Sequence, residues 1–335
     1  MYNRKMENIQ STLDMLASQS DHRTSVFDIE IERLQNSSLT LSGRLLNESQ
    51  LEALARHFSK WKLDTGSIRI LHRGDLPRMH VATNLAGLYE KPTFGMPLSS
   101  ELSYGMEVEI LDEEGKWVFT RQHDGYLGWA YKTYLTEGHA TQATHLVLAP
   151  SYELRAQPDQ TSEILTRVVS GTGIALEETR GEWAKVTANK TGWMPATLLR
   201  PISDIPGSLA EKRQTIMKDS ARMIGVPYLW GGISGNGIDC SGFTRLLHKW
   251  VGINIPRDAD MQHANATPVE PPFEVGDLLF FSESGSERQI THVGVSLGGW
   301  TMIHSSRGRN GVYVDNVQER EPLKQIFVGA GAFLR

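Results

Sequence analysis

The sequence Gly-Ile-Asp-Cys-Ser-Gly-Phe occupies residues 237–243 and contains the chain's single cysteine, Cys240. The apolar residues that follow fall on one face of a helix with 3.6 residues per turn: Phe243, Leu246, Leu247, Trp250 and Val251. This spacing predicts an amphipathic helix with Cys240 in its first turn and Asp239 as its cap. Free N–H groups and the helix dipole favour a thiolate there, so we expect a lowered thiol pKa and a nucleophile rather than a structural cysteine.

A nucleophilic cysteine needs a general base, and the base must be held by a third group. His292 lies in Thr-His-Val-Gly-Val-Ser-Leu (291–297), whose alternation predicts a strand. His304 follows twelve residues later, after the Gly298-Gly299 turn. A hairpin would bring the two rings side by side. The pattern therefore predicts His292 as the base and His304 as the residue that orients it.

The C-terminal part of the chain, residues 203–335, has the helices before the strands. A helix is expected over 208–224, then the helix that begins at Cys240. Strands are expected at 277–282, 291–297, 300–305, 311–316 and 328–334. This order predicts an α+β domain with an antiparallel sheet.

The middle of the chain contains an internal repeat with an offset near 66 residues, since Gly-Lys-Trp-Val at 115–118 matches Gly-Glu-Trp-Ala at 181–184. Short alternating segments separated by glycine turns predict two small β-barrels, at residues 79–138 and 139–202. Their pattern resembles bacterial SH3 domains. In such domains the tryptophans line a peptide-binding cleft, but we expect Trp117 and Trp183 mainly to fill the barrels.

The first 78 residues form a separate segment without catalytic motifs. Alternation predicts strands near 26–32, 39–45 and 68–71, and Asn47 precedes an apolar-periodic helix that runs through Phe58. Residues 1–24 are polar and are expected to be a frayed helix or a tail. The segment is therefore predicted to be a small α+β accessory module.

The composition excludes several classes of function. The net charge of −5 and the absence of a Lys/Arg cluster argue against nucleic-acid binding. No run of about 18 apolar residues predicts a membrane span, and the N-terminus lacks a signal-peptide pattern, which favours the cytoplasm. The alternative, if a signal peptide has been removed, is the periplasm or the outside of the cell. A single cysteine allows no internal disulfide. Cys240 and the two histidines lack a carboxylate at ligand spacing, so neither a metal nor another cofactor is expected.

Six strings in residues 210–335 resemble, in order, those of the NlpC-type cysteine peptidases of bacterial cell walls. They are Tyr-Leu-Trp-Gly-Gly (228–232), Asp-Cys-Ser-Gly-Phe (239–243), Ile-Pro-Arg-Asp-Ala (255–259), Gly-Asp-Leu-Leu-Phe-Phe (276–281), Thr-His-Val-Gly-Val (291–295) and Ile-His-Ser-Ser (303–306). The resemblance implies a papain-like catalytic domain with Cys240, His292 and His304 as its catalytic set. The fold is therefore expected to be multidomain: an α+β N-terminal module, two bacterial SH3 β-barrels and a papain-like domain.

Two SH3 domains ahead of this domain are similar to γ-D-glutamyl-L-diamino acid endopeptidases. The similarity implies hydrolysis of the γ-D-Glu–L-diamino acid bond (Lys or meso-diaminopimelate) in peptidoglycan stem peptides with a free N-terminal L-Ala, in murein recycling. It also implies a set of substrate-binding candidates: Glu90, Tyr126, Tyr228, Trp230, Asp239, Ser241, Arg257 and Asp258. We expect Tyr228 and Trp230 to form an apolar wall and Asp239, Glu90 and Tyr126 to recognise the ammonium group.

Three alternatives remain open at the level of the sequence. One is a wall-degrading endopeptidase that acts on intact peptidoglycan. Another is an acyltransferase on the same fold, although such enzymes usually have Asp as the third residue, where this chain has His304. The last is a peptide-binding SH3 protein with an inactive catalytic domain, which the complete set of Cys240, His292 and His304 disfavours.

Overall fold

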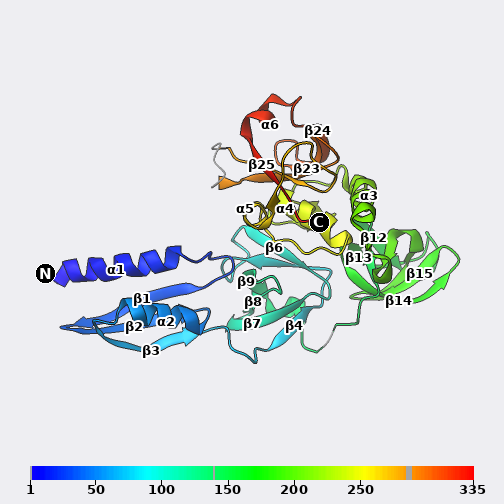
Figure 1. Ribbon diagram of the computed structural model, residues 1–335. Coiled ribbons are helices and arrows are strands. Elements are labelled where there is room, and N and C mark those ends of the chain that lie inside the picture. The colour runs from blue at the N-terminus through cyan, green and yellow to red at the C-terminus, as the bar shows by residue number, and fades with distance from the viewer. Residues whose placement is uncertain (1, 139, 284–288) are drawn as a thin grey trace. The chain divides into compact units, whose positions relative to one another are not determined.

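The computed structural model of the chain describes residues 2–138, 140–283 and 289–335 (Figure 1). The backbone divides into two compact units: Met1–Met79 with Glu107–Lys132, and His80–Met106 with Thr133–Arg335. Among the described residues, no helix is both long enough and apolar enough to span a membrane.

The first unit begins with an α+β module. Strands β1 (Phe27–Gln35) and β2 (Ser38–Leu45) are antiparallel, and β3 (Lys62–Ile70) pairs with β2 in parallel. Parallel neighbours need a crossover connection, and helix α2 (Glu48–His57) supplies it. Asn47 and Gln50 form a capping box at the start of α2. The three predicted strands and the helix are present, but β3 begins at Lys62, six residues before the predicted start, and ends at Ile70.

Helix α1 (Tyr2–Ser18) corrects the expectation of a frayed helix or a tail. Its side chains Ile9, Leu13 and Leu16 are buried, and the first two share a core with all three strands and α2. Spacings of four and three residues place them on one helix face. Because this apolar stripe is narrow and the rest of the helix is polar, the composition of the segment did not indicate a packed helix.

The first unit also contains an antiparallel meander from the first repeat, made of β7 (Glu107–Glu114), β8 (Trp117–Arg121) and β9 (Leu127–Tyr131). The meander packs on the N-terminal module. A small apolar cluster joins Leu46 and Leu71 to Leu111 and Leu127. The N-terminal module therefore shares a hydrophobic core with strands of the first barrel.

The remaining strands of the first repeat lie in the second unit. β5 (Leu85–Tyr89) and β6 (Leu98–Ser103) form a hairpin. β4 (Arg78–Val81) starts in the first unit and ends in the second, where it pairs with β10 (Leu135–Thr136). The short helix η1 (Lys132–Tyr134) precedes β10.

The second repeat is a seven-stranded sheet with strand order β13-β12-β16-β15-β14-β11-β17. Its strands are β11 (His145–Val147), β12 (Ser151–Arg155), β13 (Ile164–Val169), β14 (Gly173–Arg180), β15 (Trp183–Thr187), β16 (Thr191–Pro195) and β17 (Leu199–Pro201), with η2 (Ala196–Leu198) and η3 (Ile202–Asp204) beside β17. Trp117 is buried in the first repeat, whereas Trp183 is only partly buried here. The expectation that the tryptophans fill the barrels therefore fits Trp117 better than Trp183.

The C-terminal domain has the expected α+β layout and is coloured from green to red in Figure 1. Its helices are α3 (Leu209–Ser220), η4 (Ala221–Met223), α4 (Cys240–Trp250), α5 (Ala259–Asn265) and α6 (Glu321–Ile326). The strands β20 (Thr267–Pro268), β21 (Leu278–Phe281), β22 (His292–Ser296), β23 (Thr301–Ser306), β24 (Gly311–Asn316) and β25 (Phe327–Ala332) form one sheet, ordered β20-β25-β21-β22-β23-β24. A separate ribbon pairs β18 (Ile233–Ser234) with β19 (Gly237–Ile238).

Helix α4 packs against the centre of this sheet through its apolar stripe. Phe243, Leu247 and Trp250 are buried in one core with Val293 and Val295 of β22. Burying large side chains of this kind contributes roughly 1.5–3 kcal/mol each. The packing fixes the N-terminal end of α4 near the start of β22.

Candidate active site

Cys240 is the first residue of α4, as the sequence predicted. Asp239 is the N-cap, with extended backbone angles, and its Oδ1 accepts a 2.6 Å hydrogen bond from the Gly242 N–H. The Cys240 thiol also accepts backbone hydrogen bonds from Val293 and Ser241. The nucleophile candidate is therefore held between a helix start and strand β22.

The two histidines lie on neighbouring strands of the sheet. His292 is the first residue of β22, and His304 lies in the middle of β23. His292 Nε2 and His304 Nδ1 are 2.7 Å apart, which is hydrogen-bonding distance. The predicted pairing of these two rings is confirmed.

Asp315 extends this pair, and the sequence analysis missed it. Its Oδ2 lies 2.9 Å from His304 Nε2, while its Oδ1 accepts hydrogen bonds of 2.8 and 2.9 Å from Arg309 and Arg320. Asp315 lies on β24, opposite Met302 in the strand register. Asp315 follows His304 by eleven positions in the chain, and the pairing of β23 with β24 brings the two side chains together.

Burial determines the resting protonation of the nucleophile and the base. Loss of solvent raises the pKa of the Cys240 thiol to about 12, and the nearby Asp239 carboxylate adds to the rise. Loss of solvent also lowers the pKa of the His292 imidazole to about 3, with a further contribution from His304. Burial thus favours the neutral thiol and the neutral imidazole, and it acts against the lowered thiol pKa expected from the helix start.

Asp239 and Arg257 form a buried ion pair beside the nucleophile. Arg257 Nη1 and Nη2 lie 3.1 and 2.7 Å from Asp239 Oδ1 and Oδ2, and the Gly231 N–H donates to Oδ2 at 2.9 Å. The Ser241 hydroxyl accepts from Arg257 Nη1 at 3.0 Å. Asp258 lies at the edge of this pair, 3.8 Å from Arg257 Nη1. The structure thus brings four predicted site residues together: Asp239, Ser241 and Arg257 are hydrogen-bonded to one another, and Asp258 is ion-paired with Arg257.

Tyr228 and Trp230 flank the segment that leads to Cys240. Tyr228 is half-buried, and burial raises the pKa of its phenol, with a smaller contribution from Cys240. Trp230 is 61% exposed. Gly231 adopts φ +77, and a Cβ there would come within 2.6 Å of the Leu98 carbonyl oxygen on β6. This close approach requires glycine.

Strand β6 brings a further carboxylate, that of Glu101, which the sequence analysis did not identify. Glu101 Oε2 accepts a 3.0 Å hydrogen bond from the Ile233 N–H. Burial raises the pKa of Glu101, and the Asp239 carboxylate also raises it, whereas the hydrogen bond and Arg257 act in the opposite direction. No motif singles out Glu101, because its role depends on the docking of β6 against the 231–233 segment.

Two further predicted site residues, Glu90 and Tyr126, belong to the first repeat. Glu90 follows β5 and is exposed, and Tyr126 is buried in the first unit. Their roles stay predictions.

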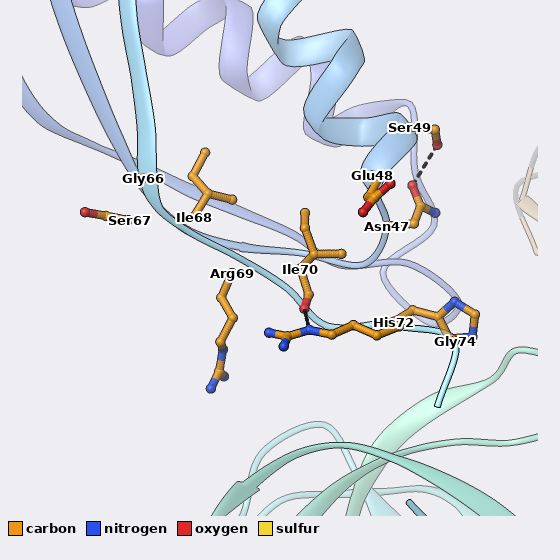
Figure 2. Close-up of a pocket in the computed structure, with 11 residues that line it drawn as sticks. Asn47, Glu48, Ser49, Gly66, Ser67, Ile68, Arg69, Ile70, His72 and Gly74 are labelled. Carbon is orange, nitrogen blue, oxygen red and sulfur yellow. Dashed lines mark hydrogen bonds between the residues drawn. The ribbon is translucent and has the colours of Figure 1, made fainter. Parts of the chain in front are cut away.

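A surface pocket lies elsewhere, beside the start of α2 and the end of β3 (Figure 2). Asn47, Arg69 and His72 line it, and none of the predicted site residues does. At this pocket Asn47 Oδ1 accepts a hydrogen bond from Ser49, and Arg69 pairs with Asp112. We assign it no catalytic role. No group of three metal-ligating side chains occurs within residues 2–138, 140–283 and 289–335.

Comparison with known proteins identifies the family of this site. The pattern of the NlpC/P60 family matches residues 225–330, that of the bacterial dipeptidyl-peptidase Sh3 domain matches 88–133, and that of the bacterial SH3 domain matches 151–200. A gamma-D-glutamyl-L-lysine dipeptidyl-peptidase of Bacillus cereus is 30% identical over 236 residues, which cover 65% of this chain and 70% of that protein. The chain belongs to the NlpC/P60 family.

Two further similarities cover more of this chain. Dipeptidyl-peptidase 6 of Lysinibacillus sphaericus is 27% identical over 261 residues, covering 72% of this chain and 93% of that protein. A crystal structure of an NlpC/P60 family protein from Bacillus cereus matches with a TM-score of 0.67 and 24% identity, covering 77% of this chain and all of that one. The predicted fold, two bacterial SH3 domains followed by a domain of a cysteine-peptidase family, is confirmed.

Proposed function

We propose that the protein is a cysteine peptidase that hydrolyses the γ-D-Glu–L-diamino acid bond of peptidoglycan stem peptides with a free N-terminal L-Ala. The observation that supports this proposal most strongly is the arrangement of three side chains: the Cys240 thiol lies at a helix start, and the rings of His292 and His304 are paired. Relatives named for γ-D-glutamyl-L-lysine dipeptidyl-peptidase activity support the choice of bond.

The reaction follows from the neutral resting pair. Cys240 sulfur attacks the γ-carbonyl carbon of D-Glu while its proton passes to His292, so charge develops only as the C–S bond forms. Backbone N–H groups at the start of α4 stabilise the oxyanion. His292 then gives the proton to the departing amine, leaving a thioester. A water molecule, deprotonated by His292, hydrolyses the thioester and restores the thiol.

Recognition of the substrate ammonium is assigned to carboxylates next to Cys240. Asp239 is already neutralised by Arg257, so it contributes little further attraction. Glu101 has a partly buried carboxylate with one backbone hydrogen bond and is the stronger candidate in this unit. Glu90 and Tyr126 remain the candidates from the sequence. An ammonium group paired in a partly dry pocket discriminates well, since its absence leaves a carboxylate unpaired.

A requirement for a free amine would restrict the enzyme to released stem peptides and favours murein recycling in the cytoplasm over digestion of the intact wall. The test compares L-Ala-γ-D-Glu-L-Lys and its diaminopimelate counterpart with N-acetylated and sugar-linked forms. We expect blocking of the amine to lower kcat/KM by at least about a hundredfold, or ~2.7 kcal/mol. Efficient release of peptides from intact sacculi would replace recycling with wall degradation. Peptide binding without turnover would indicate a binding protein. Transfer of the acyl group to an added amine in preference to water would indicate an acyltransferase.

A further inference from the structure

A line of hydrogen-bonding groups runs from β22 through β23 to β24. His292 Nε2 lies 2.7 Å from His304 Nδ1, and His304 Nε2 lies 2.9 Å from Asp315 Oδ2. His304 and Asp315 are 1% and 9% exposed, so water has little access to these bonds. Three successive strands thus connect the base to a carboxylate that does not belong to the predicted catalytic set.

The end of this line is held as an anion. Burial by itself raises the pKa of Asp315, but hydrogen bonds from His304 and Arg320 outweigh burial and hold that pKa below its usual value. Arg309 and Arg320 both donate to Oδ1, which leaves Oδ2 for His304. Arg309 also stacks on the Tyr313 ring at 4.1 Å, which restricts its guanidinium.

An ionised carboxylate can only accept hydrogen bonds, and this restriction fixes the protons along the line. His304 Nε2 must carry a proton, so in a neutral ring Nδ1 is bare. His292 Nε2 must then carry a proton and donate a hydrogen bond to His304 Nδ1, so His292 Nδ1 is unprotonated. A general base needs an unprotonated nitrogen, so Nδ1 is the atom of His292 that can accept the thiol proton.

We propose that Asp315 is a positioning residue which, through His304, fixes the His292 tautomer that leaves Nδ1 free to accept a proton from Cys240. Arg309 and Arg320 hold the carboxylate in the required orientation. The part of the inference that concerns turnover rests on the proposed peptidase function, whereas the proton positions can be measured without any substrate.

Asp315→Asn tests the inference because an amide has one accepting and one donating end. The two arginines attract its oxygen, so the amide NH₂ group faces His304 Nε2 and requires that nitrogen to accept. His304 Nδ1 then carries the proton and donates to His292 Nε2, and the His292 proton moves to Nδ1. We expect kcat to fall by about a hundredfold or more with KM within about threefold. The analogous Asp→Asn change in a Ser-His-Asp triad lowers kcat by ~10⁴.

Asp219 offers a matched control in the same domain. It is 2% exposed and lies between Arg200 and Arg222, but it belongs to α3 and makes none of the site's hydrogen bonds. Asp219→Asn therefore removes a comparable buried carboxylate from between two arginines. We expect it to lower stability without changing the His292 tautomer or the kcat of the folded enzyme.

The deciding measurement is ¹⁵N–¹H correlation NMR of the imidazole rings in histidine-labelled protein, assigned with His292→Ala and His304→Ala. The wild type should show protons on Nε2 and bare Nδ1 atoms in both rings. In Asp315→Asn the His292 ring proton should move from Nε2 to Nδ1, whereas in Asp219→Asn it should stay on Nε2. A wild-type His292 with its proton on Nδ1 would overturn the proposal, and this arm holds even if Asp315→Asn does not fold. An unchanged tautomer in folded Asp315→Asn, or an unchanged kcat despite a reversed one, would also overturn it. Absence of peptide cleavage by the wild type would sink the proposed function and leave the NMR result to decide the proton positions.

Discussion

The Ser100 hydroxyl accepts a 2.9 Å hydrogen bond from Nε of Arg257, and both side chains are almost completely buried. Ser100 belongs to β6 of the first SH3 repeat, whereas Arg257 holds Asp239 beside the nucleophile. The neighbouring Glu101 bonds to Ile233 in the segment before Cys240. Through Ser100 and Glu101, strand β6 therefore contacts the residues that hold and precede the nucleophile.

The Arg257–Asp239 pair should be essential for stability. Arg257→Met leaves Asp239 buried without its partner, and breaking a buried pair in this way costs about 3–5 kcal/mol. Urea unfolding measures the change. Lys132→Met, which removes an exposed pair with Glu113, is the control and should cost less than about 1 kcal/mol. Equal decreases in the free energy of unfolding in the two variants would show that the buried pair contributes no more to stability than an exposed pair.

The thiol of Cys240 should react slowly at rest. Its raised pKa of about 12 keeps it protonated at pH 7, and thiolates are the reactive form. We expect iodoacetamide to alkylate the folded protein more slowly than the same protein unfolded in guanidinium, with a rate that rises as the pH increases. Mass spectrometry of the labelled protein follows the reaction. Faster labelling of the folded protein than of the unfolded protein near pH 7 would instead support a thiolate at rest, as the helix start alone predicts.

A buried histidine away from the site should make folding stability depend on pH. His248 is completely buried and loss of solvent lowers its pKa to about 4, against 6.5 for an ordinary histidine. Between these values the unfolded state binds more protons, so stability falls as pH decreases from 6.5 to 4, by about 3 kcal/mol at most. His292 acts in the same direction. Urea unfolding at several pH values should show a smaller slope for His248→Gln, and identical slopes would contradict the assignment.

Glu101 and Glu90 are chemically matched candidates for the substrate ammonium. Glu101→Gln should raise KM for free-amine peptides by at least about tenfold and reduce the discrimination against N-acetylated ones. Glu90→Gln, at an exposed position, should change both less. Steady-state kinetics on the two peptide forms measure the effect. A larger effect at Glu90 would return the ammonium site to the sequence-based choice.

Local patterns predicted the parts of the site that depend on a single element or on one hairpin. The stripe after Cys240 placed the helix start, and the alternation around His292 and His304 placed two rings on adjacent strands. Asp315 and Glu101 were missed because each reaches the site through strand pairing or domain docking, which one sequence does not encode locally. The effect of burial on the Cys240 pKa was missed for a related reason, since desolvation depends on everything packed around the thiol.

The central claim is that the Cys240 thiol cleaves the γ-D-Glu–L-diamino acid bond. Its most direct test is mass spectrometry of L-Ala-γ-D-Glu-L-Lys and of the diaminopimelate peptide after incubation with wild type, Cys240→Ala, His292→Ala and His304→Ala. Nucleophile and base act as one unit, whereas His304 mainly holds a ring. We therefore predict L-Ala-D-Glu and the free diamino acid from wild type, no product from the first two variants, and a trace from His304→Ala. Product from Cys240→Ala, or cleavage at the L-Ala–D-Glu bond instead, would contradict the account.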